Sequence, residues 1–285
     1  MSNHVTLTLH QAEEAASCDV SSVLIPFPSG PKLNPITDYF NTTSGLIKKI
    51  IDTKYADDAE ILGLLVLGIV SSAEFYFRTI LSQLSQTCPL SLRHTELINI
   101  PSASNAFYSG SGFPATMSAF EHESLADSKK ISAEIKRFAG FTCAESSSVK
   151  KALDDFEVLC ELRHCFVHAR GFAGVKAVRA LGGSRVVHKV LIKQQQALDL
   201  IKLSHNAVRA VNHYLGNEVI NSWIDKDVLS GRWSADRTLF ISYWKLFAKQ
   251  GEDAYGGVAR KAYALIRPSI IKRQQAIAAR VAAIA

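Results

Sequence analysis

The sequence contains no C-x-x-C pair, no glycine-rich phosphate-binding motif, and no H-E-x-x-H or G-x-S-x-G motif. These absences exclude the common nucleotide-binding, zinc-protease and serine-hydrolase classes. Five cysteines, an odd number, do not suit the disulfide framework of a secreted protein. Cys160 and Cys165 lie beside His164 and His168, which suggests zinc as an alternative, but no second pair of ligands has the spacing of a zinc site. We therefore expect reduced thiols, no metal and no other cofactor.

Long apolar runs are also missing. The longest, residues 61–70, is shorter than the roughly 20 residues that a membrane-spanning helix needs, and Glu60 and Glu74 lie close to its ends. This pattern indicates a buried helix. The first residues lack a positive segment followed by an apolar core and a cleavage site, so we expect a cytoplasmic protein without membrane contact.

The charge of the chain is unevenly distributed. The net charge is +6 over 285 residues, and the segment from Gly231 onward holds ten Lys and Arg residues against three acidic residues. A concentrated basic surface attracts polyanions such as nucleic acids, because binding releases counterions from the phosphates. The alternative is a solvated charged face that only keeps the protein soluble.

Helical periodicity dominates the chain after a proline-rich segment, residues 1–35, which is expected to be extended. The pattern predicts helices over residues 35–51 and 57–85, a long loop from Cys88 to Met117, and a helix over 117–138 that Gly140 stops. A further helix is predicted over 149–169, ended by Gly171. A loop as long as the one from Cys88 to Met117 is typical of a functional or mobile insertion.

The helical periodicity is interrupted at residues 171–190, where valines flank Gly182 and Gly183. A glycine turn between β-branched runs predicts a short β-hairpin. Helical periodicity returns over 193–215, and shorter helices are expected at 235–249, 254–266 and 269–284, separated by Gly251 and Pro268. We divide the chain into an extended segment (1–35), a helical domain (36–216) and a basic helical appendage (217–285).

One segment, residues 161–171, has a pattern that points to chemistry. Arg163 is followed by four residues and then His168 near the end of a predicted helix. The polar His164 comes directly after the arginine, and Gly171 comes shortly after His168. This arrangement resembles the motif of HEPN-family ribonucleases. The similarity in layout covers residues 37–215, its specific part is about a dozen residues, and residues 216–285 have no counterpart in the family.

The resemblance implies a mostly α fold: a four-helix up-and-down bundle with a small β-hairpin insertion, here followed by an extra C-terminal helical appendage. It also implies a homodimer in which both motif copies line one cleft, and metal-independent cleavage of RNA by attack of the 2′-hydroxyl on the adjacent phosphate. A defence or toxin–antitoxin context, with an antitoxin or regulatory partner, would follow. The charge of the C-terminal segment, and not the resemblance, suggests that this segment holds the RNA; the expected RNA-binding side chains are Arg170, Lys245, Lys249, Arg260 and Lys261.

The residue types of the motif suit this chemistry. A histidine such as His168 titrates near neutral pH and transfers protons, and Arg163 can hold two phosphate oxygens. At about 100° per residue, however, the two side chains lie roughly 140° apart around an ideal helix. They meet only in a cleft shared by two subunits or at a helix end that unwinds at residues 169–171. We therefore expect activity to require dimerisation.

Other polar residues of this helix have two interpretations. Glu157, Glu161, His164 and His168 follow one another at steps of four, three and four, and Glu161 would orient a histidine next to the catalytic pair. The alternative is a solvent-facing charged stripe with weak pairs along the helix. In the second helix, Glu74 and Arg78 are spaced for an ion pair, with a supporting role beside the cleft as the alternative.

Two other functions stay open at this point. The first is a non-catalytic HEPN-like dimerisation or RNA-binding module, in which Arg163 and His168 only crosslink the bundle. The second is an unrelated helical scaffold that matches the motif by chance.

Overall fold

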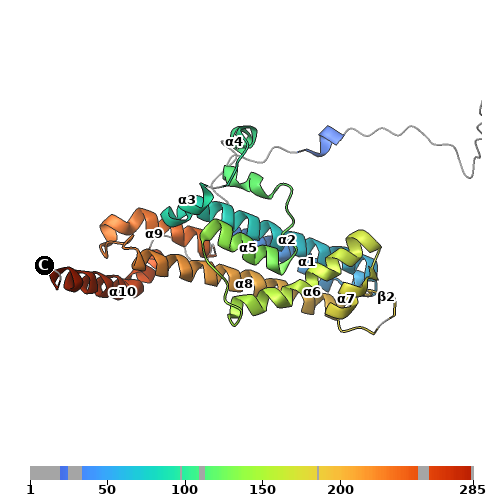
Figure 1. The fold of residues 1–285 in the computed structure, drawn as a ribbon. Helices are drawn as coiled ribbons and strands as arrows, with labels where there is room; N and C mark the ends of the chain where they lie inside the picture. Colours follow the sequence, from blue (N-terminus) through green and yellow to red (C-terminus); the bar gives the residue numbers. More distant parts are fainter. Residues whose placement is uncertain are drawn as a thin grey trace, which may run out of the picture.

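The part of the chain that the structure describes folds mostly into α-helices, which pack as a bundle around the central helix α2 (Ala59–Thr87) (Figure 1). The computed structural model describes residues 20–24, 34–96, 98–108, 113–184, 186–249 and 257–283. In chain order the elements are η1 Val20–Val23, α1 Pro35–Ile51, η2 Thr53–Tyr55, α2 Ala59–Thr87, α3 Pro89–Thr95, α4 Ser102–Tyr108, η3 Ala115–Phe120, α5 Ser128–Ala139, α6 Ser148–Ala169, β1 Phe172–Ala173, α7 Val175–Ala180, β2 His188–Lys189, α8 Gln194–Asp225, α9 Trp233–Phe247 and α10 Gly257–Ala282. Most of segment 1–35, with Cys18, lies outside these residues.

The first two long helices begin where the sequence places capping residues. Asn34 precedes α1, and its side chain accepts a hydrogen bond of 2.8 Å from the backbone N–H of Thr37. Asp58 caps α2 in the same way through the N–H groups of Glu60 and Ile61. The predicted bounds of α1 are confirmed, and α2 begins and ends two residues later than predicted.

Helix α2 is the centre of the core. It packs against α1, α5, α6 and α8, and most of its inward side chains are fully buried. By length and hydropathy α2 would also be able to cross a membrane, but core helices pass the same test, and half of its apolar window is buried. The same continuous core includes Phe240 of α9 and Tyr263 and Ile270 of α10.

The expected helix over residues 117–138 is wrong in its first half. Residues up to Phe120 form the short η3, and α5 begins only at Ser128. The backbone N–H of Leu125 donates to the Glu74 carboxylate instead of to a helical carbonyl, and Asp127 caps α5. The preceding loop is also partly helical, because α3 and α4 lie within it. Gly140 ends α5 in a left-handed conformation with φ of +77°, as predicted.

The predicted hairpin is right in its pairing but wrong in its turn. The two-residue strands β1 and β2 are antiparallel, with Phe172 opposite Lys189. Between them lies helix α7, whose Ala177 is buried against Cys165. The glycine pair ends this helix, since the N–H of Gly183 donates to the carbonyl of Val178 at 2.8 Å.

Two further helix boundaries differ from the prediction because of local packing. Helix α8 continues through Gly216 to Asp225, since the glycine makes room for α9: a Cβ there would lie 3.3 Å from the Tyr243 hydroxyl oxygen. The boundary expected at 216 therefore falls inside α8. Helix α10 continues through Pro268, which is exposed, as is Ala264, so solvent can satisfy the carbonyl that the proline leaves without a donor.

A histidine between α1 and α8 makes stability depend on pH. Burial, followed by repulsion from Arg209, lowers the pKa of His205 from its ordinary value of 6.5. The unfolded chain therefore binds this proton more readily, so the free energy of unfolding should fall as pH drops below about 6.5 and be unaffected above it. Urea unfolding between pH 7 and pH 5 should show a weaker pH dependence for His205→Gln than for the wild type. The exposed His213→Gln, also on α8, is the control, and equal curves for His205→Gln and wild type would refute the prediction.

Candidate functional site

The segment with the Arg-His motif forms the last two turns of α6. Ser147 caps the start of this helix through the N–H of Lys150, and the helix ends at Ala169, as predicted. Arg170 and Gly171 both adopt positive φ, and the N–H of Gly171 donates to the carbonyl of Cys165 at 2.9 Å. In Figure 1 this end of α6 lies beside α7 and β2, at one end of the molecule.

Two histidines form an exposed pair at this helix end. The rings of His164 and His168 are one helical turn apart, with centroids separated by 4.8 Å and planes inclined by 47°. Both side chains are exposed to solvent. Phe166, on the opposite face, anchors this part of α6 by packing closely on α2, where a Cβ at Gly63 would lie 2.8 Å from its ring. A fixed helix end thus presents two imidazole rings to solvent.

Arg163 lies on a different face of α6, next to α2. Its Nε is 3.6 Å from Oε2 of Glu74, a carboxylate that is only 6% exposed. The structure gives no other partner to the Arg163 guanidinium within the described residues, and 28% of the side chain is exposed. The terminal amino groups of Arg163 therefore stay available to an oxyanion outside the protomer.

Glu74 organises the groups around Arg163. Its Oε1 accepts hydrogen bonds from the Ser124 hydroxyl at 2.9 Å and the Leu125 N–H at 2.8 Å. Arg78 lies one turn along α2 with its Nη2 at 3.6 Å, which confirms the ion pair predicted within this helix. Glu74 also contacts Arg163, so one buried carboxylate links α2, α6 and the loop before α5.

The arginine and the histidines do not meet within one protomer. Among the described residues, no hydrogen bond, ion pair or ring contact joins Arg163 to His164 or His168. This agrees with the separation of roughly 140° that an ideal helix gives. Neither of the two pockets that the structure shows most clearly is lined by any of these three residues.

Glu161 has a partner that the sequence did not suggest. Its carboxylate is only 5% exposed and forms an ion pair with Lys176 of α7. The hydrogen bond to Glu161 raises the pKa of the Lys176 ammonium. Glu157, one turn earlier, lies 3.5 Å from Lys176 and accepts from the N–H of Ser128 at 2.8 Å. The structure therefore joins both glutamates to neighbouring elements and records no contact between Glu161 and His164.

The residues predicted to bind RNA are spread over both ends of the molecule. Arg170 is exposed next to the histidines. Lys245 lies on α9, which packs beside the second half of α8, and Arg260 and Lys261 lie on α10, toward the opposite end of the molecule from the motif (Figure 1). Helix α8 has 32 residues and is about 48 Å long, at roughly 1.5 Å per residue; its first turns lie near α6, and its second half packs against α9. The motif and the basic helices therefore lie far apart on one protomer.

Removal of the Glu74 charge is expected to destabilise the protein. Glu74→Gln leaves two guanidinium groups without their counter-charge, and we expect a loss of about 1 to 3 kcal/mol in the free energy of unfolding. Urea denaturation measures this loss. Glu60→Gln, in the exposed first turn of the same helix, should change stability by less than about 1 kcal/mol. Equal stability of the two variants would contradict a structural role for the Glu74 network.

The cysteines near the motif are buried thiols. Cys88, Cys143, Cys160 and Cys165 are free, and burial is the main cause that raises the pKa of Cys160 and Cys165. In the part of the chain that the structure describes, no group of three or more His, Cys, Asp or Glu side chains is placed to hold a metal ion.

Comparisons with protein-family models, with curated proteins and with solved structures found no match to this chain.

Proposed function

We propose that the chain is a metal-independent endoribonuclease of the cytoplasm with a HEPN-like four-helix up-and-down bundle. The observation that carries this proposal is the end of α6. It presents two exposed imidazoles with ring centroids 4.8 Å apart and, on the adjacent face, a guanidinium to whose terminal amino groups the described residues offer no partner. These are the groups that phosphoryl transfer from RNA needs: a proton donor and acceptor, and a fixed cation for phosphate oxygens.

The proposed reaction divides these tasks. His168 takes the proton from the ribose 2′-hydroxyl, and the 2′-oxygen forms a bond with the adjacent phosphorus. The bond between phosphorus and the 5′-oxygen breaks, and the leaving oxygen receives a proton from an imidazolium, for which His164 is the neighbouring candidate. Arg163 binds the non-bridging oxygens, where negative charge develops. The products are a 2′,3′-cyclic phosphate and a 5′-hydroxyl end.

The geometry favours a site shared by two protomers. Arg163 and His168 lie on different faces of α6, so one phosphate can contact both kinds of group where two such helix ends face each other. Apolar side chains surround this end, since Val167, Phe172 and Val175 are all more than half exposed. Their burial in a homodimer would remove this apolar surface from water.

The basic C-terminal helices are proposed to bind RNA at a distance from the cleavage site. Lys245, Arg260 and Lys261 are exposed, and we assign them to sequence-independent contacts with phosphates. Because α8 separates them from His168, they act only on RNA that extends along the molecule. Regulation by an antitoxin or another inhibitory protein in a defence context belongs to the same proposal.

One observation favours a second candidate function, the non-catalytic dimerisation or RNA-binding module. The buried Glu74 holds Arg163 through its Nε, so the arginine also crosslinks α6 to α2. In this alternative the motif stabilises the bundle, and the exposed histidines have no chemical role.

RNA cleavage in the presence of EDTA distinguishes the two functions. Purified full-length protein is incubated with end-labelled mixed RNA, and the new ends are mapped. Chelator-resistant cleavage that leaves 2′,3′-cyclic phosphates supports the nuclease. Binding without cleavage, measured by gel shift, would support the module instead, and neither activity would refute both.

A further inference from the structure

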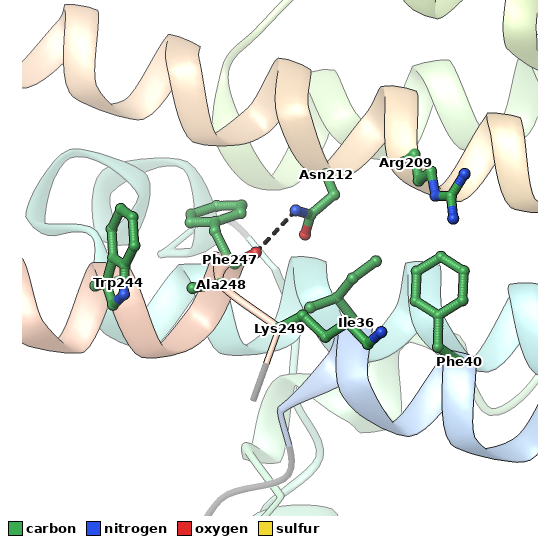
Figure 2. A pocket seen from close by; sticks show the side chains of 8 residues that line it. All are labelled: Ile36, Phe40, Arg209, Asn212, Trp244, Phe247, Ala248 and Lys249. Atoms are coloured by element: carbon green, nitrogen blue, oxygen red, sulfur yellow. Dashed lines mark hydrogen bonds between the residues drawn. The ribbon is translucent and has the colours of Figure 1, made fainter. Parts of the chain in front are cut away.

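A second site lies on the bundle where α1, α8 and α9 meet, away from the Arg-His motif. It is a pocket of about 320 Å³, and Phe40 of α1, Arg209 of α8 and Trp244 of α9 form part of its wall. Lys249, just after α9, completes it (Figure 2). The volume is at the lower limit of ligand sites in proteins and equals roughly ten waters.

Two cations converge at this pocket, and the described residues give neither of them an acidic partner. The Cζ of Arg209 lies 5.0 Å from the centroid of the Phe40 ring, and the Nζ of Lys249 lies 5.4 Å from the same centroid. Figure 2 shows the guanidinium of Arg209 beyond one edge of that ring and the ammonium of Lys249 beside it. No ion pair with either cation occurs among the described residues. Repulsion from Arg209 also contributes to lowering the pKa of the adjacent His205, as expected for a positive charge that is not neutralised.

Backbone carbonyls at the end of α9, in and beside the pocket wall, already accept hydrogen bonds. The side-chain amide of Asn34 donates to the carbonyls of Lys245, at 2.6 Å, and Ala248, at 2.7 Å. The amide of Asn212 donates to the carbonyl of Phe247 at 2.9 Å, the bond drawn in Figure 2. The end of α9 is therefore capped by two amides, and its carbonyls do not compete for the cations.

The wall also contains a donor without an acceptor. The indole N–H of Trp244 is buried and has no hydrogen-bond partner within the described part of the chain. A buried donor that lacks an acceptor is costly, and native structures rarely leave one unexplained. Together the three side chains offer donors and positive charge, while Ile36, Phe40 and Phe247 offer apolar surface. An oxyanion on an apolar body matches this combination.

We propose that this pocket binds a small organic anion, with one carboxylate or phosphate group on a compact apolar body. Arg209 and Lys249 hold the oxyanion at one end of the pocket, and the apolar wall, which extends toward Trp244 at the other end, contacts the body (Figure 2). The inference does not depend on RNA cleavage, because neither Arg163 nor His168 lines the pocket. Lys249 is the one residue that this site shares with the predicted RNA-binding set.

Binding of matched aromatic probes tests the proposal. Phenyl phosphate, benzoate, benzyl alcohol and inorganic phosphate are titrated into the full-length protein by calorimetry and by saturation-transfer NMR. We expect one of the two aromatic anions to bind with submillimolar Kd and the alcohol to bind at least about tenfold more weakly. The preferred anion then identifies the group as a phosphate or a carboxylate. The proposal is overturned if neither aromatic anion binds at millimolar concentration, if the alcohol binds equally well, or if inorganic phosphate alone binds as tightly as both.

Variants locate the binding. Arg209→Gln and Lys249→Gln should each weaken anion binding by about tenfold or more. Lys136→Gln, the same change of charge at an exposed position of α5, is the control. Unchanged affinity in both charge variants would overturn the proposal even if the probes bind. RNA cleavage by Arg209→Gln should equal that of the wild type, so failure of this site and failure of the nuclease are distinguishable.

Discussion

Replacement of His168 by alanine is expected to reduce the initial rate of RNA cleavage by about a hundredfold to ten-thousandfold, the usual contribution of a positioned acid or base. The expected loss is large because the proposed chemistry needs a group that gives and takes protons near neutral pH. His168 is exposed at the end of α6, so alanine there removes no buried contact, and the variant should fold normally. The rate is measured with labelled RNA in EDTA, and the fold is checked by thermal unfolding.

Two companion variants sharpen this test. His164→Ala should cause a smaller loss, of about tenfold or more, if His164 delivers the second proton. His213→Ala, an exposed histidine of α8, should cleave at the wild-type rate. Cleavage by His168→Ala at an undiminished rate would remove His168 from the mechanism. Equal losses in all three variants would instead indicate an effect unrelated to the motif.

Helices with local signals could be predicted from the sequence. The ends of α1 and α6 depend on Asn34, Ser147 and Gly171, and each acts within a few residues of its own position. Periodicity of the apolar residues supplied the rest, because it reports which face of a helix is buried. The sequence was therefore sufficient for most of the long helices.

The errors lie where distant contacts decide the local structure. Gly216 favours a helix end by its type, but Tyr243 and Phe247 of α9 pack against it and leave α8 continuous. The N–H of Leu125 has the option of a helical bond, but the buried Glu74 takes it. Neither partner is visible in the local sequence, since each comes from another helix.

In the candidate site, too, local features could be predicted from the sequence, whereas contacts between distant segments could not. The spacing of Arg163 and His168 is local, so the sequence was enough to place them on different faces of one helix. The contact of Arg163 with Glu74 depends on how α6 packs on α2, and Lys176 reaches Glu161 only because α7 is a helix where a strand was expected. The anion pocket combines three segments far apart in the chain, so no sequence motif indicates it.

A mixture of two inactive proteins, Arg163→Ala and His168→Ala, is expected to recover about one quarter of the wild-type activity. The reason is that each proposed site takes its arginine from one protomer and its histidine from the other. A heterodimer of the two variants then has one complete site and one site that lacks both groups. Random pairing of equal amounts makes about half of the dimers mixed, and each mixed dimer has half of its sites intact.

The wild type mixed with the Arg163→Ala/His168→Ala double variant is the matched control for this pairing. With shared sites, every mixed dimer lacks one group at each site. The mixture should then retain only about one quarter of the activity of wild-type protein at the same total protein concentration. With sites contained in one protomer, the mixture should retain about half. Sites shared between protomers therefore predict recovery in the first mixture and a larger loss in the second, whereas sites within one protomer predict no recovery and a smaller loss.

Proof that the variants exchange partners is required for a decisive result. Differently tagged Arg163→Ala and His168→Ala proteins are refolded together, and the mixed dimers are isolated through both tags before the assay. A purified heterodimer without any cleavage of RNA would show that the two groups do not come from opposite protomers. Since they also lie on different faces of α6 within one chain, the proposed mechanism would then have no arrangement in which a single phosphate contacts both.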